Sequence, residues 1–439
     1  MAPLRQWRLH AVITTEHHVN AQFDLGARIS EPHDPVHYET VRQQTIALCA
    51  PLHTEDFVVQ SMSDASPVKW HLAHTTWFFE RFVLRESAGR PAPYDARYDY
   101  LFNSYYEAVG PRHARAARGL LTRPTIDEIF AYREYVDEGM RALIHSDALD
   151  ETLTARIELG VNHEQQHQEL LLTDLKHAFW SNPMQPVYRC STEPTAVGAS
   201  PRHWHRFDGG LHEIGAGPGQ FCFDNEQPRH RVYVHPFEIA HRLVTNGEFM
   251  EFVQDGGYER PEYWLADGWA VVQSQSWRHP LYWSDSLDSE FTLAGRRPIA
   301  AWQPVCHLSY YEADAYARWT GARLPSETEW EIASLAPGTP GNFVESGQLH
   351  PSAAIPGLRL QQMLGSAWEW TSSAYSPYPG FRVSEGALGE YNGKFMANQY
   401  VLRGGSCATP ASHIRRTYRN FFYPHQRWQF TGIRLAGNV

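Results

Sequence analysis

Cysteine is scarce in this chain of 439 residues: there are five, an odd number, and no two of them form a Cys-x-x-Cys pair. Widely spaced single cysteines do not make a disulfide framework, and they exclude a cysteine-based zinc site. We therefore expect a protein of a reducing compartment, the cytoplasm. The five positions are Cys49, Cys190, Cys222, Cys306 and Cys407.

Long apolar runs and an excess of positive charge are also lacking. No apolar run approaches the ~18–20 residues that span a bilayer. Residues 1–18 lack the apolar stretch and the small-residue cleavage site of a signal peptide. The net charge of −11 opposes binding to phosphate backbones, which needs a basic surface. We expect neither a membrane nor a nucleic acid as partner.

Glycine is rare in the first part of the chain only. Residues 1–182 hold 6 of the 31 glycines and 4 of the 15 tryptophans. The length exceeds the ~250–300 residues at which a single core stops growing. Since glycine weakens helices and marks turns, we expect an α+β protein with a helical first part. The predicted divisions are an N-terminal extension (1–35), a four-helix bundle (36–182), a linker (183–205) and a domain of loops and short strands (206–439).

Four amphipathic stretches support the bundle, because apolar residues recur in them at three- and four-residue spacing. Ser66 before Pro67 predicts a helix start, with serine as the cap and proline in the first turn. In the second part, alanines and aromatics at helical spacing predict one clear helix over Ser309–Thr320. The four stretches of the first part are Val36–Ala50, Ser66–Glu86, Thr125–His145 and Asp150–Phe179.

Histidines suggest a metal site within the bundle. His163 and His167 lie four residues apart, so they share one helical face and could bind one ion. Such a pair arises easily by chance in a chain with 24 histidines. His74, on another predicted helix, would complete a three-histidine face. His71 is equally well interpreted as a ligand, as a partner of a ligand or as a core residue. Imidazole ligation suits zinc, copper, iron or nickel, and the spacing does not choose among them.

Two further pairs lie between these histidines. Tyr105 and Tyr106 are either ordinary packing aromatics or phenols that donate a proton near a metal site. Arg112 and Arg115, three residues apart, either form a fork for a substrate carboxylate or belong to a solvated basic turn.

Taken together with motifs of the second part, these residues resemble the ergothioneine sulfoxide synthases from about residue 36 onward. The resemblance implies a DinB-type four-helix bundle followed by a formylglycine-generating-enzyme domain, which is a distorted C-type-lectin-like fold. Most motif residues are expected to be scaffold, and Trp330, Trp368 and Trp370 are interpreted as core. The motifs are Arg-Leu-Pro-Ser-Glu-Thr-Glu-Trp-Glu (323–331), Gly-Ser-Ala-Trp-Glu-Trp-Thr (365–371), Leu-Arg-Gly-Gly-Ser (402–406) and Gly-Ile-Arg-Leu-Ala (432–436).

The resemblance also implies a reaction, in which iron(II) and dioxygen serve to join the sulfur of cysteine to the imidazole of hercynine (trimethylhistidine) as a sulfoxide. Each expected role follows from a motif match. The metal ligands are His74, His163 and His167; the substrate-binding residues are Gln166 for the imidazole, Asn420 and Phe421 for the trimethylammonium group, and Arg112, Arg115 and Phe422 for the thiol; the catalytic residues are Tyr105 and Tyr106.

Alternatives remain at this point. Phe422 stands where relatives that use γ-glutamylcysteine have an aspartate, so cysteine is the expected donor and the dipeptide is the alternative. Two other functions remain as hypotheses: a zinc-dependent thiol transferase of the DinB type and a lectin-like binding module. Formylglycine generation is not expected, because only Cys407 follows the Gly-Gly-Ser stretch, where those enzymes carry two copper-binding cysteines.

Overall fold

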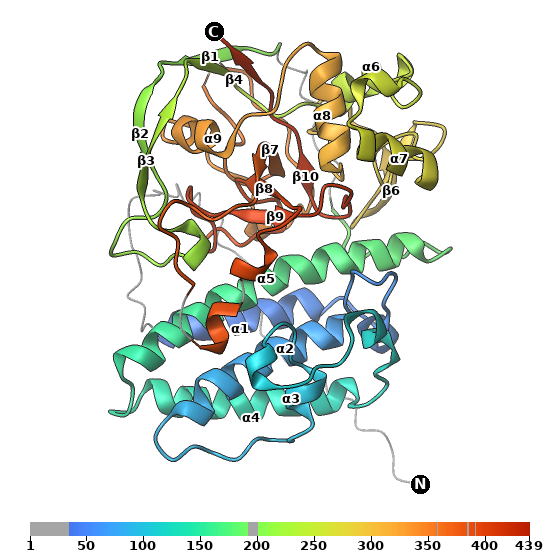
Figure 1. Ribbon diagram of the computed structural model, residues 1–439. Helices are drawn as coiled ribbons and strands as arrows, with labels where there is room; N and C mark the ends of the chain where they lie inside the picture. The colour runs from blue at the N-terminus through green and yellow to red at the C-terminus, as the bar shows by residue number, and fades with distance from the viewer. Residues whose placement is uncertain (1–34, 192–200, 358, 384–385, 391) are drawn as a thin grey trace, which may run out of the picture.

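The structure is a computed structural model that describes residues 35–191, 201–357, 359–383, 386–390 and 392–439. Residues 1–34 of the predicted N-terminal extension lie outside the described residues, as do residues 192–200 of the predicted linker. Long helices fill the first part of the chain, and short strands, loops and helices fill the second (Figure 1). The α+β prediction is confirmed.

The first part folds into the four predicted α-helices and one short additional α-helix, and four 3-10 helices lie in the connections between them: Thr54–Val58, Leu84–Glu86, Glu107–Val109 and Arg115–Leu120. Local signals fix two of the helix starts: Thr125 and Glu128 form a reciprocal capping box, and the Asp150 carboxylate accepts the backbone N–H of Leu153. Both devices satisfy backbone N–H groups that lack partners in the first helical turn. The helices are α1 (Pro35–Cys49), α2 (Val68–Phe82), α3 (Tyr98–Leu101), α4 (Ile126–Ile144) and α5 (Glu151–Ser181).

The predicted cap of α2 is wrong. The helix begins at Val68, and Pro67 occupies the cap position without a side-chain capping bond. Ser66 is engaged elsewhere. Its Oγ accepts a hydrogen bond from Arg118 (2.8 Å), and its backbone N–H donates to the Asp174 carboxylate (2.8 Å). The Ser66 hydroxyl, which would have accepted a hydrogen bond from the first helical turn, is thus bonded to a residue distant in sequence.

The second part contains two larger sheets and two hairpins. One sheet is antiparallel, in the order β1 (Trp204–Phe207), β4 (Phe237–Ala240), β11 (Ala436–Asn438). The other has the order β10 (Thr431–Gly432), β7 (Trp368–Ala374), β8 (Tyr400–Arg403), β9 (Asn420–Phe422), and only β10 pairs in parallel. The hairpins are β2 (Gly210–Ile214) with β3 (His230–Val234), and β5 (Ser289–Thr292) with β6 (Gly295–Pro298). The helices are α6 (Asn246–Gln254), α7 (Ala266–Gln275), α8 (Tyr310–Trp319) and α9 (Glu327–Ser334).

The arginines of two sequence motifs form buried ion pairs that stabilise this domain. Arg403 of the Leu-Arg-Gly-Gly-Ser motif contacts Glu331 at 2.8 Å. Arg434 of the Gly-Ile-Arg-Leu-Ala motif contacts Glu369 at 2.7 Å. Both guanidinium groups are inaccessible to solvent, so each needs its carboxylate partner. This arrangement fits the scaffold role expected for most motif residues.

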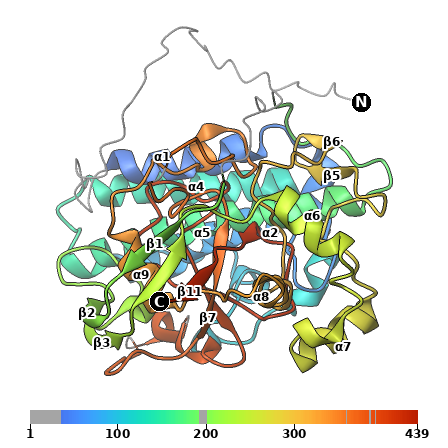
Figure 2. The same ribbon diagram turned by 90° about the horizontal axis from the view of Figure 1, so that it is seen from above.

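Helix α5 lies between the two parts of the molecule and is shared by both (Figure 1). In the view from above, strands of the second part overlie the bundle helices (Figure 2). The buried Glu169 carboxylate of α5 accepts hydrogen bonds from Trp368 (2.8 Å), Ser406 (2.5 Å) and Thr409 (2.7 Å) of the second part. No helix of the described residues is long and apolar enough to cross a membrane.

Candidate functional site

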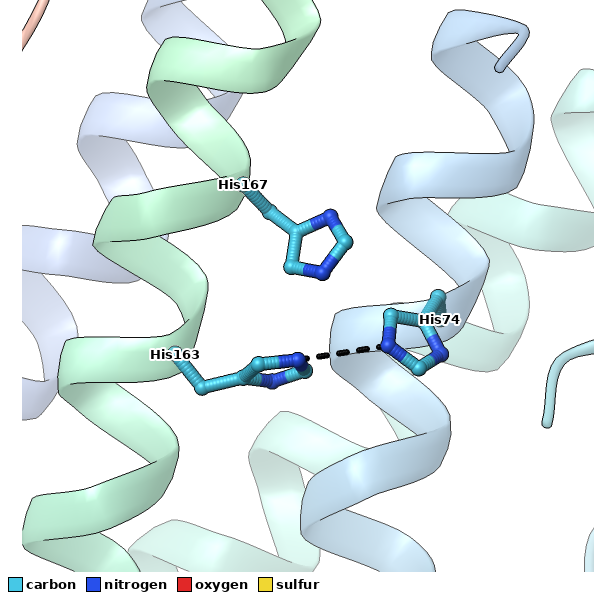
Figure 3. Close-up of side chains that lie close together, drawn as sticks. All are labelled: His74, His163 and His167. Carbon is cyan, nitrogen blue, oxygen red and sulfur yellow. Dashed lines mark hydrogen bonds between the residues drawn. The ribbon is translucent and has the colours of Figure 1, made fainter. Parts of the chain in front are cut away.

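Three histidines from two helices converge inside the bundle. His74 comes from α2, and His163 and His167 come from α5, so the second pair shares one helical face (Figure 3). The Nε2 atoms of His74 and His163 are 3.2 Å apart. One nitrogen from each of the three rings lies within 4.8 Å of the others. All three side chains are buried.

The ring of His74 is held in one orientation. Its Nδ1 donates a hydrogen bond to the Phe102 carbonyl at 2.5 Å, which leaves Nε2 as the atom that faces the other two histidines. The Trp70 ring stacks on it with centroids 4.5 Å apart. A fixed tautomer and a fixed ring plane are what a metal-binding imidazole requires.

The electrostatics of the three histidines suit a metal ligand set. Burial lowers the pKa of His163 to about 4, and burial lowers the pKa values of His74 and His167 well below 6.5. All three rings are therefore neutral near pH 7 and have lone pairs for a cation. Metal–nitrogen bonds of ~2.0–2.1 Å place two adjacent ligand nitrogens ~3 Å apart, which matches the observed 3.2 Å. The residues present fit a divalent transition metal.

Glu164 lies between two of these histidines in sequence, but its side chain is committed elsewhere. His-Glu-x-x-His is also the pattern of zinc peptidases, in which the glutamate is the general base. Here the buried Glu164 carboxylate contacts Arg133 at 2.6 Å and Arg42 at 2.8 Å. Because both of its oxygens pair with these guanidinium groups, Glu164 is a structural anion and not a base.

His71 is not a member of the trio. Its Nδ1 lies 2.8 Å from Nδ1 of His167, and its Nε2 lies 3.1 Å from the Asp174 carboxylate. Among the three interpretations left open by the sequence, the structure therefore supports the partner of a ligand.

A cavity of about 160 Å³ lies at the junction of the two parts of the molecule. Its wall includes Gln166, which directly precedes His167 on α5, and Asp174, which is linked to His167 through His71. Residues of both parts contribute, as expected for a ligand site between domains. Of the residues predicted from sequence, the structure brings together Tyr105, Arg115, Gln166, Asn420, Phe421 and Phe422 in this wall.

Aromatic rings form one side of this cavity. Phe421 stacks on Tyr375, with ring centroids 4.1 Å apart and planes 9° apart. The Phe395 ring centroid lies 6.0 Å from that of Phe421, and the Tyr105 ring is nearly perpendicular to Phe395 at a centroid distance of 5.0 Å. Aromatic rings in a cavity wall can attract a quaternary ammonium group.

The adjacent tyrosines line different cavities. Tyr105 faces the cavity that contains Gln166 and Arg115. Tyr106 is buried and lines a second cavity of about 330 Å³, whose wall includes His163. The sequence treats the two phenols alike, whereas the structure separates them.

The two arginines singled out from the sequence lie in different surroundings. Arg115 lines the cavity of about 160 Å³, whereas Arg112 is not in its wall. Arg112 pairs with Glu107 at 2.8 Å, and 41% of its side chain is exposed. Arg118, which no sequence pattern singled out, is 4% exposed. Its guanidinium donates to Ser66 at 2.8 Å, lies 3.2 Å from the Trp70 ring centroid, and has no carboxylate partner among the described residues.

Burial lowers the pKa of Arg118 to about 9, as expected for a buried cation without an anion beside it. Arg118 lies three residues after Arg115, at the same spacing that separates Arg115 from Arg112. That repeated spacing was the available signal, but it could not show which arginine is buried and which lines the cavity.

Comparisons with known proteins agree with this architecture. Residues 37–171 match the DinB superfamily, and residues 194–356 and 350–439 match the sulfatase-modifying factor enzyme 1-like domain. The protein is thus of the class that joins a DinB bundle to a sulfatase-modifying-factor domain. The chain is 30% identical over 286 residues to the formylglycine-generating enzyme of Streptomyces coelicolor, covering 53% of this chain and 87% of that protein.

Two further relatives extend over both domains. The hercynine oxygenase of Mycolicibacterium smegmatis is 32% identical over 405 residues, and that of Mycobacterium tuberculosis is 33% identical over 408 residues. In each case the match covers 85% of this chain and 91% of the relative. The chain belongs to the hercynine oxygenase family.

Proposed function

We propose that this protein is an iron(II)-dependent, cytoplasmic oxygenase of ergothioneine biosynthesis, which joins cysteine to hercynine as a sulfoxide. The observation that carries the proposal is the arrangement of the site. A three-histidine centre is linked through His71 to Asp174, which lines a cavity together with Gln166 and Arg115 of the bundle and Asn420 and Phe421 of the second domain. Membership of the hercynine oxygenase family supports the choice of substrate.

The proposed reaction is a four-electron oxidation. A carbon–sulfur bond forms at the imidazole carbon between the two nitrogens, and that carbon and the thiol each lose a hydrogen. One atom of dioxygen ends on sulfur, and the other leaves as water with the two hydrogens. Iron(II) held by the three histidines would supply the open coordination positions and the redox chemistry that dioxygen activation requires.

Charged side chains of the cavity suit a zwitterionic donor. Arg115 lines the wall, and Arg118, buried without a carboxylate partner among the described residues, lies behind it near Tyr105. We assign the carboxylate of cysteine to this pair, because buried guanidinium groups bind carboxylates strongly and with fixed geometry. Asp64, on the same wall, is suited to the α-ammonium group.

The other end of the cavity suits hercynine. Gln166 lies on α5 between His163 and His167 in sequence and is part of the cavity wall. We assign it to hydrogen bonding with the substrate imidazole. Phe421, braced by the Tyr375 ring at 4.1 Å, is assigned to the trimethylammonium group by cation–π attraction, with Asn420 beside it. Holding both substrates next to one centre makes the joining step effectively intramolecular, which lowers its barrier by ~7–11 kcal/mol.

Tyr105 is the better candidate for the proton donor. It lines the substrate cavity, and its phenol oxygen accepts a hydrogen bond from Arg115 at 3.4 Å. Tyr106 lies against the second cavity beside His163 and is assigned to closing that side of the centre.

The other readings make different predictions about metal and product. A zinc-dependent thiol transferase would need no dioxygen and no second domain at its site, and a lectin-like module would need no metal centre. The lining of one cavity by both domains favours the oxygenase. The apolar Phe422 in this wall favours cysteine over γ-glutamylcysteine.

The test begins with protein purified without oxygen and loaded with iron(II). Hercynine, cysteine and oxygenated buffer are then added, and the products are identified by mass spectrometry. We expect one iron per chain and a product with the mass of the cysteine–hercynine sulfoxide. His74→Ala is the matched control and should lose both metal and product. Stoichiometric zinc with no oxygen-dependent product would refute the proposal, as would the absence of any bound transition metal.

A further inference from the structure

A chain of hydrogen bonds leads from Asp174 to the candidate metal ligand His167. The Asp174 carboxylate lies 3.1 Å from Nε2 of His71, and Nδ1 of His71 lies 2.8 Å from Nδ1 of His167. All three side chains are buried, with exposed fractions of 5%, 3% and 8% in the order of the chain. Water is thus largely excluded, and each polar atom depends on its protein partner.

The direction of every hydrogen bond in this chain follows from Asp174. Its carboxylate also accepts the Ser66 backbone N–H at 2.8 Å and the Trp428 indole N–H at 3.3 Å. Surrounded by donors, it is an acceptor toward His71 as well, so Nε2 of His71 carries the proton. In the neutral imidazole Nδ1 is then the acceptor, and Nδ1 of His167 must be the donor. The lone pair of His167 therefore lies on Nε2.

We propose that Asp174 and His71 are positioning residues that fix the tautomer and ring orientation of His167, so that its Nε2 faces the metal. This inference rests on the proposed metal centre. His74 gains the same control directly from the Phe102 carbonyl, whereas His167 gains it through a second imidazole. Such outer hydrogen bonds tune metal affinity without touching the ion.

These hydrogen bonds also connect the candidate metal centre to the second domain. Trp428 belongs to that domain and lines the substrate cavity together with Asp174. Its hydrogen bond helps to hold Asp174 in place, so docking of the second domain supports a ligand of the bundle. Among the described residues, the group that could hold a metal ion consists of His74, His163 and His167, and it includes neither His71 nor Asp174.

The first test uses metal-free full-length protein, so it does not depend on activity. Nitrogen-15 NMR of labelled histidine distinguishes the two neutral tautomers of a ring. We expect His167 in the Nδ1–H form in the wild type. In His71→Leu, which removes the acceptor, the His167 resonances should shift toward a mixture of tautomers. An Nε2–H tautomer in the wild type, or an unchanged His167 spectrum in His71→Leu, would overturn the proposal.

The second test measures affinity for cobalt(II), a spectroscopic probe ion, by competition with a chelator. We expect His71→Leu and Asp174→Asn to bind ~10- to 100-fold more weakly than the wild type. His71→Gln should recover most of the loss, because an amide can donate to Asp174 and accept from His167. His177→Leu is the control. His177 also lies on α5, but its side chain is hydrogen-bonded to Ser61. The affinity of His177→Leu for cobalt(II) should therefore equal that of the wild type.

The outcomes separate this inference from the proposed function. Loss of all metal binding in both His71→Leu and His71→Gln would make His71 a ligand and overturn the positioning role. Wild-type affinity in His71→Leu and Asp174→Asn would overturn it too. Normal positioning results together with a wild-type protein that forms no sulfoxide would refute the proposed reaction alone.

Discussion

Glu164→Gln should destabilise the bundle strongly. Glu164 lies between the candidate ligands His163 and His167 in sequence, but its role is structural. Its carboxylate joins three helices. It contacts Arg133 of α4 at 2.6 Å, Arg42 of α1 at 2.8 Å and Thr45 of α1 at 2.6 Å. Glutamine keeps the shape but removes the charge, so two buried guanidinium groups lose their shared counter-ion.

The magnitude follows from the titration of this carboxyl. Burial raises the pKa of Glu164, but Arg133 and Arg42 outweigh burial and hold the pKa at about 2, against 4.5 for an ordinary glutamate. Each pKa unit corresponds to ~1.4 kcal/mol, so the charge contributes ~3 kcal/mol of stability. The contribution is complete above pH 4.5 and is lost as the pH falls toward 2, because the unfolded carboxyl binds its proton first.

Thermal unfolding measures this loss. With an unfolding entropy of ~2.1 cal/mol/K per residue, ~3 kcal/mol lowers Tm by ~3 °C if the whole chain unfolds as one unit, and by ~10 °C if residues 36–182 unfold alone. Glu86→Gln is the control, since its partner Arg81 is on the surface and the change should stay within ~0.5 kcal/mol. A Tm for Glu164→Gln equal to that of the control at pH 7 would refute the reasoning.

Four other predictions follow from the site and the buried histidines. Arg118→Met should lower kcat/KM for cysteine ~10- to 100-fold, since it removes charged hydrogen bonds to the carboxylate; an unchanged value would remove Arg118 from the donor site. Phe replacement of both Tyr105 and Tyr106 should preserve iron binding while sulfoxide formation falls ~100-fold or more, and undiminished product would exclude a tyrosine role. Cysteine should exceed γ-glutamylcysteine in kcat/KM by ~10-fold or more, and Phe422→Asp should narrow that gap; a wild-type preference for the dipeptide would contradict this assignment. Burial holds the pKa of His307 well below 6.5, so the unfolded chain takes up protons first. Stability to urea should therefore fall as the pH drops below ~6.5, and a flat profile between pH 7 and 5 would count against this.

Local patterns in the sequence were sufficient for the helices. Four apolar periodicities predicted α1, α2, α4 and α5 to within a few residues, because a helix that buries one face must repeat apolar residues every three or four positions. The same regularity placed His163 and His167 on one face. The motifs of the second part predicted its fold through the family resemblance, and two of them form buried ion pairs, such as that of Arg434 with Glu369.

Other features depend on contacts between distant segments. Ser66 has the residue type of a helix cap, but its hydroxyl accepts a hydrogen bond from Arg118 and its backbone N–H donates one to Asp174. Arg112, Arg115 and Arg118 repeat one spacing, and Arg115–Leu120 form a 3-10 helix. Only the packing of this helix against the rest of the bundle decides that Arg118 is buried.

The division of Tyr105 and Tyr106 between two cavities has the same origin. Neighbouring residues outside a helix or strand can point in different directions, and the sequence does not contain the backbone angles that choose them. The hydrogen-bond chain from Asp174 through His71 to His167 likewise joins residues up to 103 positions apart. The sequence determined which residues could bind a metal, whereas packing of α2 against α5 and of the second domain on α5 decided which nitrogen of each ring would face it.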